Sequence, residues 1–379
     1  MKAGIMVITG GPGTGKTTLI RAIITAAEQN GLEPALMAPT GRAAKRLAIS
    51  SGRDADTIHK ALEASVRETG RTYFERNEAN PLEEDLIIVD EASMLDISLF
   101  YHLLCALKDG ARLILVGDID QLPPVGAGEP LKDLMSWGYV PIVRLKRIFR
   151  QEEGSGIVEN AALIRKGEMC VPDEAGEFRI VYAADDEDAY RIVMDLCREL
   201  NYGNEENKML LQVLSPMYRG VCGVDHLNES LQEMIHGEKV PDGMKFFPGD
   251  KVMQTRNDYE KGIYNGDVGT VWTATPQKGF VRYFDKEVVY EGEERFDLRL
   301  AYAVTVHKSQ GSEYETVIFI LRPSQHNMLQ RNLLYTGVTR ARKNTILVTA
   351  PDALRRALAI QHTGNRYSLF LPFLNHEAL

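Results

Sequence analysis

One glycine-rich stretch near the start of the chain, GGPGTGKTT at residues 10–18, restricts the possible folds more than any other feature. It fits the pattern G-x-x-x-x-G-K-[ST], and it lies between the apolar run Ile5 to Ile8 and a helix-like segment from Leu19 to Ala27. Between a strand and a helix, such a loop turns backbone N–H groups inward on a phosphate, and the helix adds its positive N-terminal end. We therefore predict an α/β domain with a phosphate-binding loop made of Gly10, Gly11, Pro12, Gly13, Thr14, Gly15, Lys16, Thr17 and Thr18.

Two side chains of this loop have particular tasks. Lys16 would hold the β and γ phosphates of a nucleotide, and the Thr17 hydroxyl would be a ligand of Mg²⁺. A glycine turn that binds nothing is the alternative, and the strand, loop and helix context counts against it.

Length and composition indicate an ordinary globular protein of more than one domain. The chain has 379 residues, of which 44% are hydrophobic and 8% aromatic, so two or more domains can each build a core. No apolar run approaches the roughly 20 residues of a membrane span, and the N-terminus lacks the layout of a secretory signal. We therefore expect a cytoplasmic protein with no membrane partner, whose four separated cysteines are reduced and partly buried thiols.

The net charge of -9 argues against a protein that coats nucleic acid with a uniformly basic surface. A local basic channel stays possible, because charges are screened over about 10 Å.

Two adjacent carboxylates follow a continuous aliphatic run, LIIV at residues 86–89. Such a run is typical of a strand buried on both faces of a parallel sheet, and ligands bind at the carboxyl ends of these strands. Asp90 can hold Mg²⁺, and Glu91 can accept a proton from an attacking water. Acids that merely cap a helix are the alternative, and the loop upstream makes it the weaker one.

A second strand end carries groups suited to a phosphodiester backbone. The stretch APTGRAAKRL places Pro39, Thr40 and Arg42 where a strand ends and a helix begins, so a hydroxyl, backbone amides and cations come together. A solvated basic helix start explains the same residues equally well.

Two more candidate site residues, a glutamine and an arginine, lie near the end of the first half of the chain. Gln121, in the stiff loop GDIDQLPPVGAG, is the polar group best placed to respond to a γ-phosphate. Arg150 lies in the basic cluster RLKRIFRQ, and either a nucleotide contact or a surface ion pair fits it. The polar stretch EEGSG then marks a domain boundary.

The second half of the sequence again has a pattern of alternating helices and strands, and one insertion interrupts it. From Phe246 to about Leu300, short alternating segments with Gly-Asp turns predict an antiparallel β insertion, with Tyr259, Tyr264 and Trp272 in its core rather than as base-stacking platforms. The parent pattern resumes with AVTVHKSQGSE, where Thr305 and His307 end a strand, and with YTGVTRARK, where Arg340 and Arg342 lie in a polar turn.

Taken together, these stretches resemble the RecD-type DNA helicases of superfamily 1, in the group that moves 5′ to 3′ on single-stranded DNA. The motifs GGPGTGKTT, APTGRAAKR, IIVDEAS, LVGDIDQLPP, IFRQ, AVTVHKSQGSE and YTGVTRAR occur in the family's order over nearly the whole chain.

The resemblance implies an α/β fold of two RecA-like P-loop domains with parallel sheets and ATP between them. It places the first domain at residues 1–150, with a strand-separating hairpin at about 66–80, and the second at 151–245 and 301–379, with an SH3-like insertion at 246–300. It assigns the binding of ATP and Mg²⁺ to Lys16, Thr17 and Asp90, and a contact with the ribose to Glu313. For catalysis it implies Glu91 and Gln121, with Arg150 and Arg340 as arginine fingers. Contacts with the DNA backbone fall to Thr40, Thr305 and His307.

The chain departs from the family pattern at one place. Family members carry, ahead of the P-loop strand, a glutamine-containing helix that contacts adenine. The strand here begins near Ile5, so we expect that segment to be missing. A natural short form, a subunit completed by a protein partner and an excised core all fit this expectation.

The sequence thus predicts an ATP-dependent motor on single-stranded DNA and duplex junctions, used in DNA repair or recombination. A nucleotide-dependent DNA-binding or nuclease-partner subunit that hydrolyses ATP without processive unwinding is the alternative. A P-loop kinase of small molecules is a third, and the duplicated α/β pattern counts against it.

Overall fold

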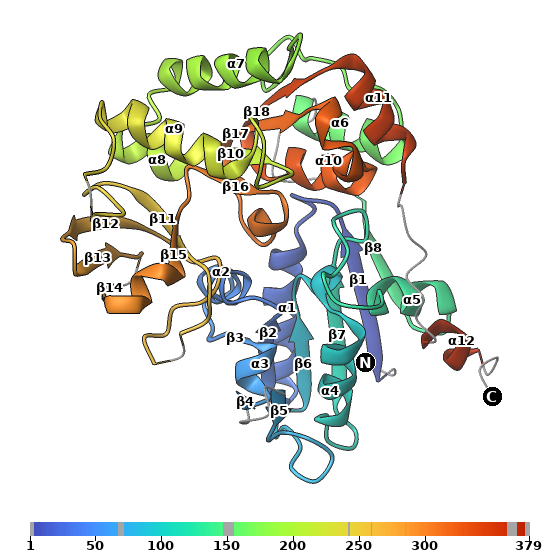
Figure 1. The fold of residues 1–379 in the computed structure, drawn as a ribbon. Coiled ribbons are helices and arrows are strands. Elements are labelled where there is room, and N and C mark those ends of the chain that lie inside the picture. The colour runs from blue at the N-terminus through green and yellow to red at the C-terminus, as the bar shows by residue number, and fades with distance from the viewer. Residues whose placement is uncertain are drawn as a thin grey trace. The chain divides into compact units, whose positions relative to one another are not determined.

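The computed structural model describes residues 4–66, 72–146, 155–241, 243–258, 260–284, 286–361 and 370–375. The chain forms two compact units, Met1–Glu153 with Gly364–Leu379, and Gly154–Thr363 (Figure 1). Each unit has its own parallel sheet. This confirms the predicted fold class.

The sheet of the first unit has six strands, all parallel, in the order β3-β2-β6-β7-β1-β8. Because alternate side chains point to opposite faces, Ile87 and Val89 enter one core cluster and Leu86 and Ile88 the other. The LIIV run is therefore buried on both faces, as predicted. The strands are β1 (Ile5–Gly10), β2 (Pro34–Ala38), β3 (Asp56–Thr57), β6 (Leu86–Val89), β7 (Arg112–Gly117) and β8 (Ile142–Leu145).

Helices cover both faces of this sheet. One core cluster joins the sheet to α1 (Lys16–Gln29) and α2 (Gly41–Ser51). The other joins it to α3 (Ile58–Ala61), α4 (Ile97–Cys105) and α5 (Pro130–Trp137). A short 3₁₀ turn, η1 (Ala92–Met94), follows the acids after β6.

The predicted hairpin of the first domain has two paired arms. Strand β4 (Ala64–Val66) pairs antiparallel with β5 (Thr72–Phe74), and Ala64 lies opposite Phe74. Residues 67–71, between the two arms, lie outside the described residues.

The short helix near the C-terminus, α12 (Phe370–Leu374), packs against α5 of the first unit (Figure 1). The Phe370 ring lies 5.7 Å from the Phe100 ring in an edge-to-face arrangement, and Leu374 contacts the same core cluster. The sequence-based division placed all of residues 301–379 in the second domain. The structure differs because these apolar side chains have their contacts in the first unit.

Replacing Phe370 with alanine is expected to lower the free energy of unfolding of the first unit by about 1–2 kcal/mol, because a half-buried ring is lost. Fluorescence of Trp137, in α5, would report urea unfolding in a Trp272→Phe background. Phe373, on the same helix, is exposed, so Phe373→Ala is the matched control. Equal effects of the two substitutions would contradict the packing of α12.

The second unit contains a five-stranded parallel sheet in the order β16-β10-β17-β18-β9. Its strands are β9 (Phe178–Tyr182), β10 (Leu211–Ser215), β16 (Ala303–Thr305), β17 (Tyr314–Leu321) and β18 (Ala341–Thr349). One core cluster packs α7 (Asp186–Glu199) and α9 (Val224–His236) on the sheet. The unit also contains α6 (Gly156–Lys166), α8 (Glu205–Leu210), α10 (Arg331–Val338), α11 (Pro351–Ala359), η3 (His307–Ser309) and η4 (Pro323–Met328).

The predicted insertion is a separate antiparallel sheet in the order β14-β13-β12-β11-β15. It comprises β11 (Lys251–Gln254), β12 (Val268–Ala274), β13 (Lys278–Arg282), β14 (Glu287–Glu291), η2 (Gly292–Asp297) and β15 (Leu298–Leu300). The expectation of a buried Trp272 is wrong, since its side chain is 58% exposed. Val271 faces the core, and Trp272 lies at an irregularity in the pairing of β12 with β13, where its ring turns outward, 5.2 Å from the Arg282 guanidinium. Tyr259 lies outside the described residues.

Two adjacent buried charges join the insertion to the rest of the second unit. Asp250 accepts hydrogen bonds from Gln232 and His236 of α9 and from the Tyr302 hydroxyl. Lys251 donates to the Leu211 carbonyl oxygen at 3.1 Å and to Gln212 Oε1 at 2.9 Å, both in β10.

Other global expectations concern cysteines and membranes. All four cysteines are free thiols, and burial raises the pKa of Cys170 and Cys197 to about 12, so these thiols are poor nucleophiles. No helix among the described residues has the length and apolar character needed to cross a membrane.

Candidate functional site: a P-loop, paired acids and a groove in the second unit

The P-loop has the geometry that its glycines predict. Gly13 and Gly15 have φ of 71° and 82°, where a Cβ would be strained, and Gly15 is the N-cap of α1. The Lys16 ammonium donates to the carbonyl oxygens of Gly10 and Gly11 at 2.8 and 2.9 Å. The amine therefore lies over the loop, where a phosphate oxygen can take the place of these carbonyls.

The two acids lie at the carboxyl end of β6, as predicted, and both are buried. Burial, followed by the charge of Glu91, raises the pKa of Asp90 to about 6, and the nearby cations Arg46 and Lys16 oppose this rise. Glu91 has a φ of 53°, which is unusual for a residue other than glycine, asparagine or aspartate. Its backbone N–H donates to Asp90 Oδ1 at 2.9 Å. This strained position is held by the structure around it, as is common at active sites.

The donor set fits a magnesium ion that is shared with a nucleotide. Thr17 and Asp90 offer oxygen ligands, which Mg²⁺ prefers, and phosphate oxygens and waters ordinarily complete its shell. Ser93 Oγ is buried and has no hydrogen-bond partner among the described residues, so one more oxygen after β6 is available. A protein-only site is not indicated, since the described residues contain no group of three or more His, Cys, Asp or Glu side chains that could hold a metal ion.

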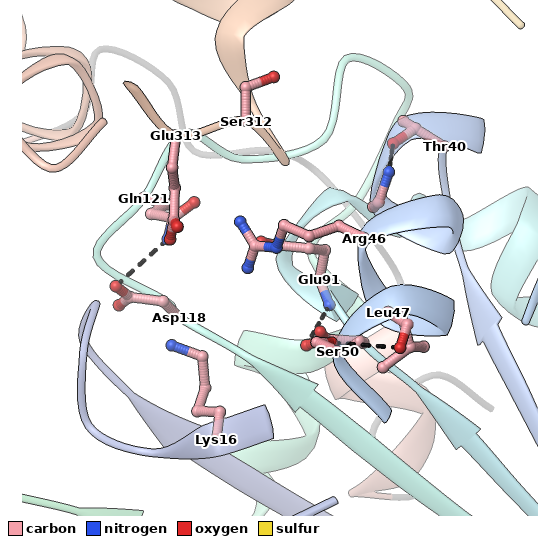
Figure 2. Close-up of polar contacts among 12 residues, drawn as sticks. Lys16, Thr40, Arg46, Leu47, Ser50, Glu91, Asp118, Gln121, Ser312 and Glu313 are labelled. Carbon is pink, nitrogen blue, oxygen red and sulfur yellow. Dashed lines mark hydrogen bonds and ion pairs between the residues drawn. The ribbon is translucent and has the colours of Figure 1, made fainter. Parts of the chain in front are cut away.

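Gln121 lies in the loop after β7 and is buried. Its side-chain amide donates to Asp118 Oδ2 at 3.5 Å (Figure 2). Asp118 Oδ1 accepts the Asp120 N–H at 3.1 Å. The loop is thus fixed by its own carboxylate.

The turn from β2 into α2 carries the predicted backbone-contact residues. Thr40 is the N-cap of α2, and its hydroxyl oxygen accepts the Ala43 N–H at 3.3 Å. Pro39 ends the approach to this turn, and Arg42 lies in the first helical turn, half-buried. The structure therefore places a hydroxyl, a helix N-terminus and a cation in one short segment.

Arg46, one turn along α2, was expected only as one of the cations of this stretch, and its contact with Glu91 was not predicted. Its guanidinium Nη2 lies 3.5 Å from Glu91 Oε1 (Figure 2). This contact joins the helix of the backbone-contact turn to the predicted catalytic acid within the first unit.

In the second unit, Thr305 and His307 follow one another at the end of β16. Thr305 is buried, and its hydroxyl oxygen accepts the Lys308 N–H at 3.2 Å. Burial lowers the pKa of His307 below its usual value, so at pH 7 the neutral ring would act as a hydrogen-bond group.

Glu313, just before β17, and Arg342, at the start of β18, form an ion pair in which two guanidinium nitrogens bind one carboxylate oxygen. Arg342 Nε and Nη2 lie 3.1 and 3.0 Å from Glu313 Oε2. Arg342 lies within β18 and not in a polar turn as expected, because the strand begins at Ala341. Arg340, just before β18, is buried and donates to the Thr336 and Ser312 carbonyl oxygens. Arg150, the other predicted finger, lies outside the described residues.

A hollow of about 640 Å³ lies between α9, the insertion and the segment around Thr305. It shares Tyr218, Thr255, Arg299 and Lys308 with a neighbouring hollow of about 850 Å³. Burial and, after it, the charge of Arg299 lower the pKa of both Lys245 and Lys308. Acids line the same hollows, Asp225 and Glu229 the first and Glu293, Glu294 and Asp297 the second, so the cations lie among carboxylates. The exposed Tyr218 ring can stack on a base.

The sequence offered no signal for this groove, because its residues come from α9, the insertion and η3, which are far apart in the chain. The alternation of turns and strands predicted the insertion but not which of its faces is lined by cations.

Three families of known domains match the chain. They are described as an AAA domain at residues 1–127, an ATP-dependent RecD-like DNA helicase SH3 domain at 227–283 and a UvrD-like helicase C-terminal domain at 300–348.

Curated proteins match over nearly the whole chain. The ATP-dependent RecD2 DNA helicase of Deinococcus radiodurans is 39% identical over 96% of this chain and 50% of its own length. The RecBCD enzyme subunit RecD of Mycolicibacterium smegmatis is 33% identical over 97% of this chain and 73% of its own length. The chain therefore spans about half of the first relative and nearly three quarters of the second.

Solved structures share the fold. The Pif1 helicase from Bacteroides in complex with ADP-AlF3 and ssDNA superimposes with a TM-score of 0.60 at 22% identity, covering 99% of this chain and 93% of that one. The Pif1 helicase from Candida albicans gives a TM-score of 0.59 at 19% identity, covering 95% and 93%.

Proposed function

Because the chain belongs to the RecD-like helicases, we propose that it is an ATP-driven motor that moves along single-stranded DNA and unwinds duplexes. The observation that carries the proposal is in the first unit, where a P-loop, a buried acid pair and a backbone-contact helix are joined by the contact between Arg46 and Glu91. In this proposal, the helix α2 takes part in both ATP hydrolysis and DNA binding.

In this proposal each first-unit residue has one task. Lys16 binds the β and γ phosphates, Glu91 accepts the proton of the attacking water, and Gln121 senses the γ-phosphate. Thr17 and Asp90 would hold Mg²⁺, which, when bound, neutralises charge on the phosphates. Arg150 and Arg340 would act as arginine fingers, and Glu313, held by Arg342, would contact the ribose.

The DNA track would include Pro39, Thr40 and Arg42 in the first unit and Thr305 and His307 in the second. The groove would extend the second-unit part of this track, because the cations Arg299, Lys308 and Lys245 line the same hollow as Thr305. We propose 5′ to 3′ movement, in DNA repair or recombination, from membership of the family.

A second candidate is a subunit that acts with a protein partner and does not unwind alone. It is favoured by the relatives described as RecBCD enzyme subunits. The two candidates differ in a measurable activity, since only the first displaces strands without added protein.

The test uses purified protein with ATP, Mg²⁺ and labelled duplexes that carry a 5′ or a 3′ single-stranded tail. We expect single-stranded DNA to stimulate ATP hydrolysis, and displacement of the strand from the 5′-tailed duplex only. ATP hydrolysis that ignores DNA would refute the motor. Stimulated hydrolysis without displacement would support the subunit.

Replacing Arg299 with alanine is expected to weaken single-stranded DNA binding alike for different base sequences, because the groove would hold phosphates. The slope of log affinity against log salt should fall by about 0.7, the value for one phosphate contact on a single strand. Fluorescence anisotropy of labelled oligonucleotides at several salt concentrations measures both. Arg198, exposed on α7 and paired with Asp195, gives the control Arg198→Ala, and an Arg299→Ala slope equal to the control's would count against the groove.

A further inference from the structure

The contact between Arg46 and Glu91 suggests how ATP hydrolysis is regulated. Arg46 Nη2 lies 3.5 Å from Glu91 Oε1 (Figure 2). The guanidinium lies against the carboxylate oxygen that would otherwise hold the attacking water. As long as the pair is closed, Glu91 Oε1 is occupied and cannot position that water.

The arginine is the more exposed partner of the pair. The Arg46 side chain is 32% exposed, whereas that of Glu91 is 9% exposed. The Glu91 backbone is held by the hydrogen bond from its N–H to Asp90. Of the two side chains, Arg46 is therefore the one that an anion from solvent can reach.

The anion expected at this end of α2 is a DNA phosphate. Arg42 and Arg46 are four residues apart on α2, so they lie on one face, about 6 Å apart along the axis. The helix begins at Thr40, whose turn is the proposed backbone-contact segment. A phosphate that reaches the first turn of α2 thus comes within range of Arg46.

We propose that Arg46 is a DNA-responsive clasp: it holds Glu91 in the DNA-free protein and moves to a DNA phosphate when a strand binds. This rests on the proposed function. Once released, Glu91 takes a proton from water, the water oxygen bonds to the γ-phosphorus, and the bond from that phosphorus to the β–γ bridging oxygen breaks to give ADP. DNA stimulation of hydrolysis then arises inside one unit.

The first experiment measures ATP hydrolysis by Arg46→Gln with and without a single-stranded oligonucleotide. Without DNA, kcat should rise on the order of tenfold, the usual size of a coupling between two sites, and the ratio of stimulated to basal rate should fall. Arg46→Lys keeps the charge and should keep the basal rate low. Arg53, in a surface pair with Glu28 at 2.7 Å, gives the control Arg53→Gln.

The second experiment measures oligonucleotide affinity against salt. If Arg46 moves to a phosphate, Arg46→Gln should reduce the slope of log affinity against log salt by about 0.7, and Arg53→Gln should leave the slope unchanged. Binding of a fluorescent ATP analogue and circular dichroism check that Arg46→Gln is folded.

The outcomes distinguish a failure of the Arg46 clasp from a failure of the proposed motor function. If the unmodified protein is not stimulated by DNA, the proposed function fails. If it is stimulated but Arg46→Gln has an unchanged or lower basal rate, the clasp is refuted and the motor stands. An unchanged salt slope likewise refutes the transfer of Arg46 to a phosphate.

Discussion

Replacing Glu91 with glutamine is expected to lower the DNA-stimulated kcat of ATP hydrolysis by roughly 10²- to 10⁴-fold, the usual contribution of a general base. Glutamine keeps the length and shape of the side chain but cannot take a proton from the attacking water. ATP binding should be spared, because Lys16 and the P-loop amides are untouched. Steady-state hydrolysis and titration with a fluorescent ATP analogue measure the two effects separately.

The control for this substitution is Glu63→Gln. Glu63 also has a positive φ, of 52°, but its side chain is exposed and pairs with Arg76 at 2.9 Å. A backbone effect of the substitution would appear in both variants, and a catalytic effect only in Glu91→Gln. A kcat of Glu91→Gln within a few-fold of the unmodified protein would rule out Glu91 as the base.

The same variant also distinguishes the roles of Glu91 and Arg46. Arg46→Gln is expected to raise basal hydrolysis, but only if Glu91 can accept the proton. The double variant Glu91→Gln with Arg46→Gln should therefore be as inactive as Glu91→Gln alone.

The P-loop and the acid pair were predictable because each is specified by neighbouring residues. The glycines of residues 10–15 allow the positive φ angles that the loop adopts, and the LIIV run before Asp90 fixes the end of a buried strand. Local sequence carries this information without any knowledge of tertiary contacts.

Contacts between distant elements could not be predicted in this way. Arg46 reaches Glu91 because α2 packs on β2, the strand next to β6, and Arg342 reaches Glu313 because the parallel register sets Ala341 beside Tyr314. In a motif such as APTGRAAKR, three cations look alike, and only packing shows which one faces an acid. The predicted roles of the site residues therefore stay proposals, whereas the strands that carry them are observed.

The exposure of Trp272 shows a second limit of prediction from the sequence. Aromatic residues in a small β domain are usually buried, but Val271 takes the inward position and Trp272 lies at an irregularity in the strand pairing. The register of β12 depends on its pairing with β11 and β13. Composition alone therefore assigns Trp272 to the insertion but does not predict which face of the sheet its side chain occupies.

Replacing Asp250 with alanine is expected to lower the free energy of unfolding of the second unit by about 3–5 kcal/mol, the range for breaking a buried charge network. The carboxylate is fully buried and accepts hydrogen bonds from Gln232, His236 and Tyr302. Alanine would leave these donors without their acceptor in a low-dielectric interior, where an unpaired polar group is costly. Urea unfolding followed by Trp272 fluorescence in a Trp137→Phe background reports on the insertion directly.

Two comparisons make the prediction specific to the network. Glu233 is an exposed acid on α9, the helix that supplies Gln232 and His236, and Glu233→Ala should change the free energy of unfolding by no more than about 0.5 kcal/mol. Asp250→Asn keeps the side-chain shape but replaces one acceptor with a donor, so it should remain destabilising. If Asp250→Ala unfolded like Glu233→Ala, this network would not be what holds the insertion to the parallel sheet. Other contacts between the two parts would then do so, such as the hydrogen bond from Lys208 Nζ to the Gly249 carbonyl oxygen.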